Sequence, residues 1–324
     1  MRVLVTGGAG FIGSHITDRL IALGCEVAVL DNLATGRREH VHPAATFIQA
    51  DVTDPRLARR LAGERFDAVA HQAAQVSVPR SVDEPRFDAQ VNLVGTMNLM
   101  EYACSAGVKR FVFASSAAVY GSPTRLPVAE NTPTHPQSPY AESKLAAEDY
   151  LRRYSGACRM RLVVLRYANV YGPRQRAHGE SGVVCALMSQ ILAGRPAVIN
   201  GDGMQTRDFV YVSDVAEANV LALRSDATAG VYNVGTAVAT RILDLHALLA
   251  GPDAAWRHGP PRSGDVRHSV LDTSAIRAGL GWQPAVSLAD GLAHTWRYFV
   301  SNPDNGLRPP ATPNAISRTV MPHV

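Results

Sequence analysis

Residues 2–13 read RVLVTGGAGFIG, a short apolar run that leads into three evenly spaced glycines, Gly7, Gly10 and Gly13. A segment with helical spacing of apolar residues follows over 13–23. Glycines in such a turn let the backbone approach a pyrophosphate, and the amide groups at the N-terminus of the next helix favour an anion. The GxxGxxG spacing is one residue off the GxGxxG of many dinucleotide folds, but its place between a strand and a helix strengthens it. The stretch predicts a dinucleotide site.

The alternation of strand and helix patterns continues from this turn to about residue 172. Strand-like runs occupy residues 25–30, 46–50, 66–71, 110–114 and 162–166, and helical patterns occupy 93–106 and 138–154. Strands separated by helices of ~10–15 residues form βαβ units, which build a parallel sheet. The sequence therefore predicts an α/β fold with a doubly wound, Rossmann-type parallel sheet.

The pattern changes after residue 172, where stretches rich in Gly, Pro and Arg interrupt shorter elements. Such stretches usually form loops over a binding cleft. We expect a dinucleotide-binding domain over 1–172, a smaller substrate-binding region over 173–300 and a poorly ordered tail over 301–324. Within 207–234, the runs Phe209–Val212 and Val231–Val234 are expected to return to the main sheet.

Composition excludes several classes of protein. Hydrophobic residues make up 46% and charged residues 19%, which argues against disordered, collagen-like and coiled-coil chains. Lys and Arg number 32 against 28 Asp and Glu and are scattered, so the charge suits an anionic small ligand better than a nucleic acid. No apolar stretch approaches the ~20 residues of a membrane span, and residues 1–30 do not resemble a signal peptide. We expect a soluble, cytoplasmic protein.

The cysteines and histidines suggest no further chemistry. Cys25, Cys104, Cys158 and Cys185 form no CxxC pair, and we expect reduced, mostly buried thiols in a cytosolic protein. The 11 histidines lack the spacing of metal ligands, so we expect no metal site.

Two carboxylates end the second and third predicted strands. Asp31 follows Gly13 by 18 residues, where a carboxylate would accept hydrogen bonds from a ribose and favour NAD over NADP. Arg37 and Arg38 could argue for NADP, but we interpret them as a solvated loop pair because neither directly follows Asp31. Asp51 could reach the adenine amino group, and a turn or helix cap explains it about as well.

Tyr140 and Lys144 lie four residues apart on a predicted helix and therefore share a face. A free tyrosine has a pKa near ~10 and is a poor base at neutral pH. A lysine cation and the positive ring of an oxidised nicotinamide would lower that pKa. An isolated YxxxK is usually an ordinary surface pair, but here a dinucleotide turn precedes it and the hydroxyls of Ser115 and Ser116 end a strand. The combination favours a catalytic site.

At these residues the chain resembles the extended short-chain dehydrogenase/reductases, and within them the nucleotide-sugar 4-epimerases. The resemblance runs from residue 1 to about 300. Its blocks are GGAGFIG (7–13), DNLATG (31–36), HQAA (71–74), SSAAVYG (115–121), SPYAESK (138–144), RYANVYGPRQ (166–175), GDGMQTRDFVYVSDV (201–215) and PPRSGDVRHSVLD (260–272). That many ordered blocks are specific for the family and much less specific for the substrate.

The resemblance implies an NAD-dependent 4-epimerase of a UDP-hexose of the glucose/galactose type. Tyr140 would take the proton of the sugar 4-hydroxyl, Lys144 would also hold the nicotinamide ribose, and Ser116 would hydrogen-bond the same sugar oxygen. The hydride would pass from C4 to tightly bound NAD, leaving a 4-keto sugar that turns and takes it back on its other face. His71 would support the cofactor loop.

The resemblance also implies the residues around the ligands. Those near NAD are Gly7, Gly10, Phe11, Ile12, Gly13, Asp31, Asn32, Gly36, Asp51, Val52, Ala73, Ala74, Gln75, Asn92, Tyr140, Lys144 and Tyr167. Those near the UDP-sugar are Ser77, Ser116, Tyr140, Asn169, Arg176, Val183, Arg207, Arg262 and Asp265. Arginines suit a diphosphate because the guanidinium fork meets two oxygens at once, although any one of them could instead form a surface ion pair.

Several alternatives stay open. The related dehydratases and decarboxylases carry acids where this chain has Ala117 and Ala118, so elimination and decarboxylation lack an evident acid or base. Arg176 resembles the arginine with which epimerases of UDP-glucuronic acid hold the C6 carboxylate, whereas residues 178–184 resemble the glucose type. Two alternatives belong to other functional classes: a 4-keto reductase that releases its cofactor, and a non-catalytic NAD sensor. By resemblance, the helices over 92–106 and 138–154 would pair in a homodimer as a four-helix bundle.

Overall fold

The computed structural model describes residues 1–176, 182–225, 229–260 and 266–302. A seven-stranded sheet dominates it, with the strand order β11-β6-β5-β4-β1-β2-β3 and every neighbouring pair parallel. The strands are β1 (Arg2–Thr6), β2 (Glu26–Asp31), β3 (Thr46–Gln49), β4 (Ala68–His71), β5 (Arg110–Ser116), β6 (Arg161–Tyr167) and β11 (Gly230–Val234). Side chains of the inner strands are buried on both faces, as parallel sheets require, whereas no residue of the edge strand β3 is fully buried.

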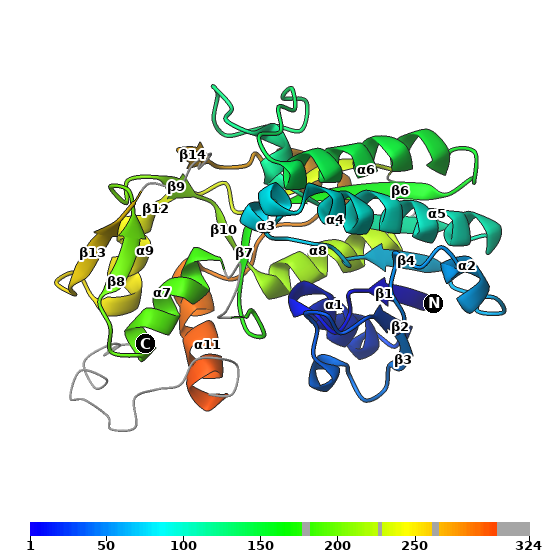
Figure 1. The fold of residues 1–324 in the computed structure, drawn as a ribbon, viewed down its shortest axis with the longest axis horizontal. Helices are drawn as coiled ribbons and strands as arrows, with labels where there is room; N and C mark the ends of the chain where they lie inside the picture. Colours follow the sequence, from blue (N-terminus) through cyan, green and yellow to red (C-terminus); the bar gives the residue numbers. More distant parts are fainter. Residues whose placement is uncertain (177–181, 226–228, 261–265, 303–324) are drawn as a thin grey trace.

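Helices cover the two faces of this sheet (Figure 1). One apolar core cluster joins the sheet to α1 (Phe11–Ala22), α8 (Val212–Arg224) and α10 (Ser274–Leu280). A second cluster, on the other face, joins it to α2 (Leu57–Arg60), α5 (Gly95–Ser105) and α6 (Pro139–Ser155). The predicted doubly wound, Rossmann-type α/β fold is confirmed.

The sequence patterns did not predict several short elements at the carboxyl end of the sheet. They are the 3-10 turns η1 (Arg38–His40) and η3 (Ala117–Tyr120), the helices α3 (Val78–Asp83) and α4 (Pro85–Ala89), and the π turn η2 (Gln90–Val94) between α4 and α5. Pieces this short show too few repeats for a helical period to emerge. None of the helices in the described ranges combines the length and apolarity needed to span a bilayer.

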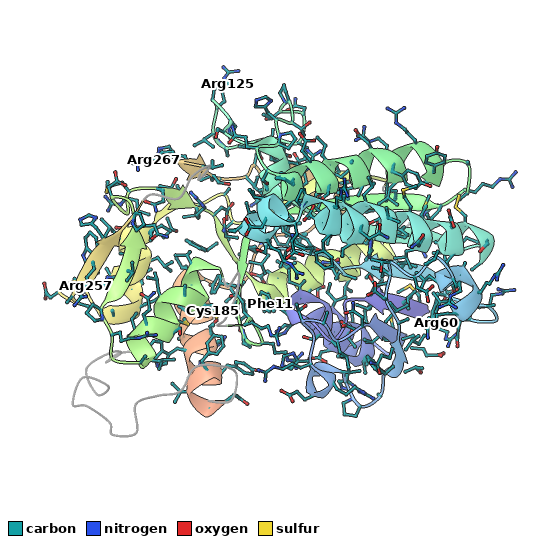
Figure 2. The ribbon with its side chains drawn as sticks, in the orientation of Figure 1. Phe11, Arg60, Arg125, Cys185, Arg257 and Arg267 are labelled. Atoms are coloured by element: carbon teal, nitrogen blue, oxygen red, sulfur yellow. A yellow bond between two sulfur atoms is a disulfide. The ribbon has the colours of Figure 1, made fainter. Side chains whose placement is uncertain are left out.

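A smaller lobe lies to the left in Figure 1 and has its own apolar core. It contains α7 (Val183–Leu192), β8 (Ala197–Asn200), β9 (Thr206–Arg207), β12 (Thr240–Arg241), α9 (Ile242–Ala250), β13 (Trp256–Gly259), β14 (His268–Ser269) and α11 (Leu288–Ser301). Phe11, at the start of α1, packs against this core, which includes Cys185 of α7 (Figure 2). The glycine turn and the lobe are therefore in direct contact.

The two runs expected to return to the main sheet behave differently. Val231–Val234 lies in β11 at the edge of that sheet. The prediction for Phe209–Val212 is wrong: β10 (Phe209–Tyr211) pairs in parallel with β7 (Asn169–Tyr171) in a separate two-stranded sheet, and Val212 begins α8. An apolar run shows that a strand is buried but does not show which neighbour it pairs with. The expected tail lies, beyond Asn302, outside the described residues.

Cys104 and Cys158 form a disulfide, so the prediction of reduced thiols is wrong for this pair. Their Cα atoms are 5.1 Å apart although 54 positions separate them in the sequence. Cys104 lies in α5 and Cys158 follows α6, and these two helices pack against each other. Sequence spacing does not reveal this proximity, and the argument from free thiols to a cytosolic location does not hold for this pair. Cys25 and Cys185 are free.

Candidate active site

The glycine turn between β1 and α1 is too tight for side chains. Gly7 has a φ of +67°, and a Cβ there would lie 2.7 Å from the backbone nitrogen of Ala73. A Cβ at Gly13 would meet the carbonyl oxygen of Gly7. The amide of Gly10 donates to that same oxygen at 3.0 Å. The spacing of the glycines therefore follows from the close approach of three backbone segments.

The N-terminus of α1 presents amide groups suited to an anion. The Ser14 amide, which donates to the Gly10 carbonyl at 3.2 Å, makes the first helical bond. The amides of Phe11, Ile12 and Gly13 precede that bond, and Gly10 has no side chain to cap them. Orphan amides and the positive end of the helix dipole fit a pyrophosphate, so this turn fits the cofactor that the sequence predicts.

Asp31 lies at the carboxyl end of β2, beside the glycine turn, and is 7% exposed. Its Oδ2 accepts from the Ala9 amide at 3.0 Å and its Oδ1 from the Leu33 amide at 2.8 Å. Burial raises the pKa of Asp31, and the two amides oppose that shift. Gly36 lies so close that a Cβ there would be 2.9 Å from Oδ1. Each oxygen keeps a lone pair that could accept from a ribose hydroxyl.

The interpretation of Arg37 and Arg38 as a solvated pair holds for Arg38, which is exposed, but not for Arg37, which is half-buried. The guanidinium of Arg38 stacks 4.4 Å from the ring centroid of Phe47, and Arg37 pairs with Glu39 at 3.0 Å. Arg38 therefore covers apolar surface from an exposed position, and the charge of Arg37 has a local partner.

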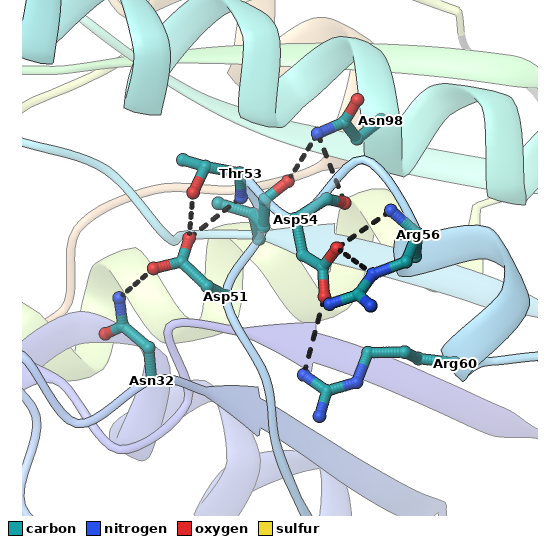
Figure 3. Close-up of polar contacts among 8 residues, drawn as sticks. Asn32, Asp51, Thr53, Asp54, Arg56, Arg60 and Asn98 are labelled. Carbon is teal, nitrogen blue, oxygen red and sulfur yellow. Dashed lines mark hydrogen bonds and ion pairs between the residues drawn. The ribbon is translucent and has the colours of Figure 1, made fainter.

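Asp51 is held in a turn after β3 (Figure 3). Asn32 donates to its Oδ2 at 2.8 Å, and the amide and hydroxyl of Thr53 each donate to its Oδ1 at 2.8 Å. Burial favours a higher pKa for Asp51, but the bonds from Thr53 and Asn32 outweigh it and the pKa is lowered. Asn98 fixes the following residue by donating to the Val52 carbonyl at 2.9 Å. The turn role is thus visible in the structure, and the contact with adenine stays a prediction.

His71, the last residue of β4, helps to fix the loop that follows this strand. Its Nδ1 and the Thr6 hydroxyl are 2.7 Å apart, and its Nε2 lies 3.0 Å from the Thr96 hydroxyl. The Thr6 oxygen also accepts from the Ala73 amide at 3.3 Å. Burial, with a contribution from the nearby charge of Lys144, lowers the pKa of His71 to about 3, so this imidazole is neutral.

Asn92 and Gln75 clamp the same loop further along the chain. The Gln75 amide donates to Asn92 Oδ1 at 2.9 Å, and Asn92 Nδ2 donates back to the Gln75 carbonyl at 3.0 Å. The Ser77 amide donates to Gln75 Oε1 at 2.5 Å. The Ser77 hydroxyl caps α3 by accepting from the Arg80 amide at 3.0 Å. Ala74 is half-buried within this loop. The predicted cofactor residues 73–75 and the predicted sugar residue Ser77 therefore form one rigid segment.

Ser116 and Tyr140 meet at the carboxyl end of β5. Ser138 caps α6 by accepting from the Ala141 amide at 3.2 Å, with Pro139 in the first turn, so Tyr140 lies one residue into the helix. The Ser116 hydroxyl accepts from the Ala118 amide at 3.1 Å and hydrogen-bonds the Tyr140 phenol. A serine and a tyrosine in this arrangement can hold one oxygen and move its proton.

Lys144, one helical turn further along α6, is 3% exposed. Its ammonium donates to the Ala114 carbonyl at 3.0 Å and lies 5.0 Å from the ring centroid of Phe113. Burial lowers its pKa to about 8, and the carboxylates of Asp88 and Glu148 act in the opposite direction. Lys144 therefore stays largely protonated at neutral pH.

The lowered pKa expected for Tyr140 is not found in the protein alone. Burial raises it, the bond from Ser116 opposes that rise, and the charge of Asp88 adds to it. In the absence of a second cation such as the oxidised nicotinamide ring, the Tyr140 phenol therefore stays protonated at neutral pH.

Other predicted residues divide between buried supports and the edge of the lobe. The Tyr167 hydroxyl hydrogen-bonds Gln72 Oε1 at 3.3 Å and Asn219 Oδ1 at 3.1 Å. Any contact of Tyr167 with the cofactor would therefore come from its backbone. Asn169, in β7, pairs with Phe209 in β10, two residues after Arg207 in β9. Asn169 and Arg207, from different blocks of the sequence, are thus brought close together: the Asn169 amide donates at 2.9 Å to the carbonyl of Asp208, the residue after Arg207.

The structure describes two of the four remaining residues predicted near the substrate. Val183 begins α7 and is half-buried, and Arg176 is exposed. Arg262 and Asp265 lie outside the described residues, as does most of the segment 178–184 that resembles the glucose type.

Sequence reasoning missed a buried ion pair beneath the catalytic helix. Arg166 of β6 binds Glu148 of α6 through Nε–Oε1 at 3.0 Å and Nη2–Oε2 at 2.6 Å, and Glu148 also accepts from Ser115. Burial opposes the charge of Arg166, yet Glu148 raises its pKa. Glu148 follows Lys144 by four residues, so the helical spacing that relates Tyr140 to Lys144 could have identified it.

Comparisons with known proteins agree with this geometry. The family model described as the NAD dependent epimerase/dehydratase family matches residues 3–235. A UDP-glucose 4-epimerase of Mycolicibacterium smegmatis is 47% identical over 309 residues, which cover 92% of this chain and 98% of that protein. The structure of UDP-glucose 4-epimerase with UDP-glucose from Thermotoga maritima matches with a TM-score of 0.90 and 42% identity, over 93% of this chain and 99% of its own.

A second solved structure, the Thermus thermophilus UDP-glucose 4-epimerase in complex with NAD, matches with a TM-score of 0.87 and 45% identity, over 93% of this chain and 99% of its own. The family model spans the glycine turn, Ser116, Tyr140 and Lys144. This chain belongs to the NAD-dependent epimerase/dehydratase family.

Proposed function

We propose that this protein is an NAD-dependent 4-epimerase that interconverts UDP-glucose and UDP-galactose. The observation that carries the proposal is the meeting of Ser116 and Tyr140 at the end of β5, with the buried Lys144 one turn away on α6. The similarity to UDP-glucose 4-epimerases over more than nine-tenths of the chain supports the same activity.

The residues of the chain divide the work of binding and proton transfer. The amides at the start of α1 would hold the pyrophosphate of NAD, Asp31 the adenosine ribose and Lys144 the nicotinamide ribose. When bound, NAD supplies the oxidation of the sugar C4 and its reduction again. Tyr140 accepts the proton of the 4-hydroxyl and returns it to the same oxygen. Ser116 holds that oxygen, and the Lys144 ammonium stabilises the phenolate.

The turn after Ser116 favours epimerisation over elimination. Residues 117–120 form η3, and the side chains of Ala117 and Ala118 beside the catalytic serine carry no acid or base. A dehydration or decarboxylation needs such a group next to the 4-keto sugar. The predicted UDP contacts Val183 and Arg207 lie on the lobe and Asn169 lies on β7; these residues would hold the nucleotide while the sugar turns.

Proton NMR of the purified protein with UDP-glucose, without added NAD, tests the proposal. We expect the anomeric signal of UDP-galactose to grow until both sugars are at equilibrium, because the cofactor is retained through the cycle. A parallel tube with UDP-glucuronic acid tests the reading of Arg176 as a carboxylate ligand. If UDP-glucose stays unchanged even after NAD is supplied, the proposal is wrong.

We also propose that the protein is a homodimer formed through α5 and α6. Apolar side chains are exposed on this side: Tyr154 of α6 is 50% exposed, and Val82 and Phe87, on the α3 and α4 helices that pack on α6, are 61% and 39% exposed. Sedimentation equilibrium should give twice the mass of the chain. A single-chain mass at micromolar concentration would contradict the dimer.

A further inference from the structure

Asp88 is a buried carboxylate that the proposed chemistry does not use. It lies in α4 and is 1% exposed. Its Oδ1 accepts from Gln75 Nε2 at 2.7 Å and from Asn92 Nδ2 at 3.1 Å, and its Oδ2 accepts from the Ser143 hydroxyl at 2.5 Å. All three donors are neutral. A buried negative charge is costly unless it is hydrogen-bonded, so this position demands a reason beyond packing.

The three donors belong to separate parts of the candidate site. Gln75 holds the loop that contains the predicted cofactor residues, and it also donates to the Ser77 carbonyl at 2.9 Å. Asn92 lies in the π turn η2. Ser143 lies between Tyr140 and Lys144 on α6. One carboxylate therefore ties the loop after β4 to the helix that carries the proposed base.

Asp88 also acts on the two ionisable groups of that helix. Its charge raises the pKa of Lys144 against the effect of burial, and it adds to the raised pKa of Tyr140. The other ionisable groups near Lys144 are Glu148, whose charge is shared with Arg166, and His71, which burial keeps neutral. Asp88 is thus the carboxylate near Lys144 whose hydrogen-bond partners are all neutral.

We propose that Asp88 is a positioning residue of the active site: its carboxylate fixes Ser143 of the catalytic helix against the Gln75 loop and supplies the negative charge that balances the buried Lys144 ammonium. This inference rests on the proposed function for its kinetic consequences. Its electrostatic part concerns the protein itself and can be measured without turnover.

The substitution Asp88→Asn separates charge from shape. An asparagine can still accept from Gln75 and Asn92, while its amide donates to Ser143, whose hydroxyl then turns to the Tyr140 carbonyl, 3.0 Å away. Loss of the negative charge lowers the pKa of both Lys144 and Tyr140. The phenolate then forms at lower pH and the ammonium is lost at lower pH, so both limbs of the pH profile of kcat should move down by about one pH unit.

A second readout follows the Tyr140 phenolate directly. We would titrate the NAD-loaded protein by ultraviolet absorbance and subtract the titration of its Tyr140→Phe counterpart. The difference isolates one tyrosine, and in Asp88→Asn it should move to lower pH by a similar amount. The matched control is Asp83→Asn, the same change of charge at an exposed position five residues earlier, which should leave the titration in place.

Ser143→Ala removes the clamp and keeps the charge. We expect kcat to fall about tenfold, the equivalent of one hydrogen bond to a charged group, with both limbs of the profile in place. If this variant keeps the kcat of the parent, the clamp is overturned, and that result does not depend on whether Asp88→Asn folds.

The remaining outcomes separate this inference from the proposed function. If the parent protein epimerises UDP-glucose but Asp88→Asn lowers kcat without moving either the profile or the phenolate titration, Asp88 is structural only and the electrostatic part is wrong. If the parent does not epimerise UDP-glucose but the phenolate titration still moves, the proposed function fails and the role of Asp88 in the charge balance stands.

Discussion

The sheet-centred part of the molecule and the smaller lobe are built in different ways. Strands of the sheet have four to seven residues, while β9, β12 and β14 of the lobe have only two each. The proposed base and its helix are fixed by buried hydrogen bonds, whereas the predicted contacts of the lobe that the structure describes lie at the start of α7 (Val183) and on a two-residue strand (Arg207). Under the proposed function, the chemical step belongs to the sheet-centred, rigid part and the binding of the sugar nucleotide to the lobe.

The largest effect should follow a change in the rigid part at the base itself. Tyr140→Phe removes the hydroxyl that moves the proton but keeps the ring, so kcat for UDP-glucose should fall about a thousandfold with the fold intact. NMR conversion assays and circular dichroism check this. Tyr154→Phe, on the same helix but half exposed, is the control and should keep full activity. Comparable rates for the two variants would contradict the assignment of the base.

Breaking the disulfide should affect stability and leave substrate binding unchanged. The double substitution Cys104→Ser with Cys158→Ser removes a crosslink between residues 54 positions apart, and unfolding free energy should fall by about 3 kcal/mol. Denaturant unfolding measures the change, with Cys25→Ser as the control. A large rise in KM for UDP-glucose would show that the two parts are coupled more tightly than the structure indicates.

The glycine turn should be intolerant of a single methyl group. Gly13→Ala places a Cβ against the Gly7 carbonyl, so stability should fall by about 2 kcal/mol and the protein should purify with less NAD. Gly156→Ala is the matched control, because Gly156 has a helical backbone (φ −63°) and nothing lies within 4 Å of its Cβ position. Equal NAD contents in the two variants would argue against the turn as the pyrophosphate site.

The smallest effect should come from the lobe. If Arg207 holds the diphosphate equally in the ground and transition states, Arg207→Ala should raise KM for UDP-glucose about tenfold and change kcat little. Arg257→Ala, at an exposed position on the outer edge of the same lobe (Figure 2), should change neither. A fall in kcat with constant KM would place Arg207 in the chemical step and weaken the division between the two parts.

Much of the rigid part could be predicted from sequence because its signals are local. The strand, glycine turn and helix over residues 2–23 are consecutive, and Tyr140 and Lys144 are one helical turn apart. Asp31 follows its strand directly. In each case the physical requirement, a close backbone approach or a shared helix face, acts between neighbours in the chain.

The missed features depend on contacts between distant segments. Asp88 contacts Gln75 and Ser143 only because α4 packs against α6, and the spacing of these residues in the sequence does not predict the contact. The disulfide likewise joins α5 to the residues after α6. The pairing of β10 with β7 instead of the main sheet also depends on tertiary packing. In the lobe, two-residue strands carry too little pattern to be recognised at all.

The most direct test of the central claim uses UDP-glucose that carries deuterium at C4, incubated with the protein in ordinary water. The account predicts UDP-galactose that retains the deuterium at C4 with no net consumption of NAD, because C4 is oxidised and reduced again within one site. Loss of the deuterium to solvent, or product that accumulates only as added NAD is consumed, would contradict it.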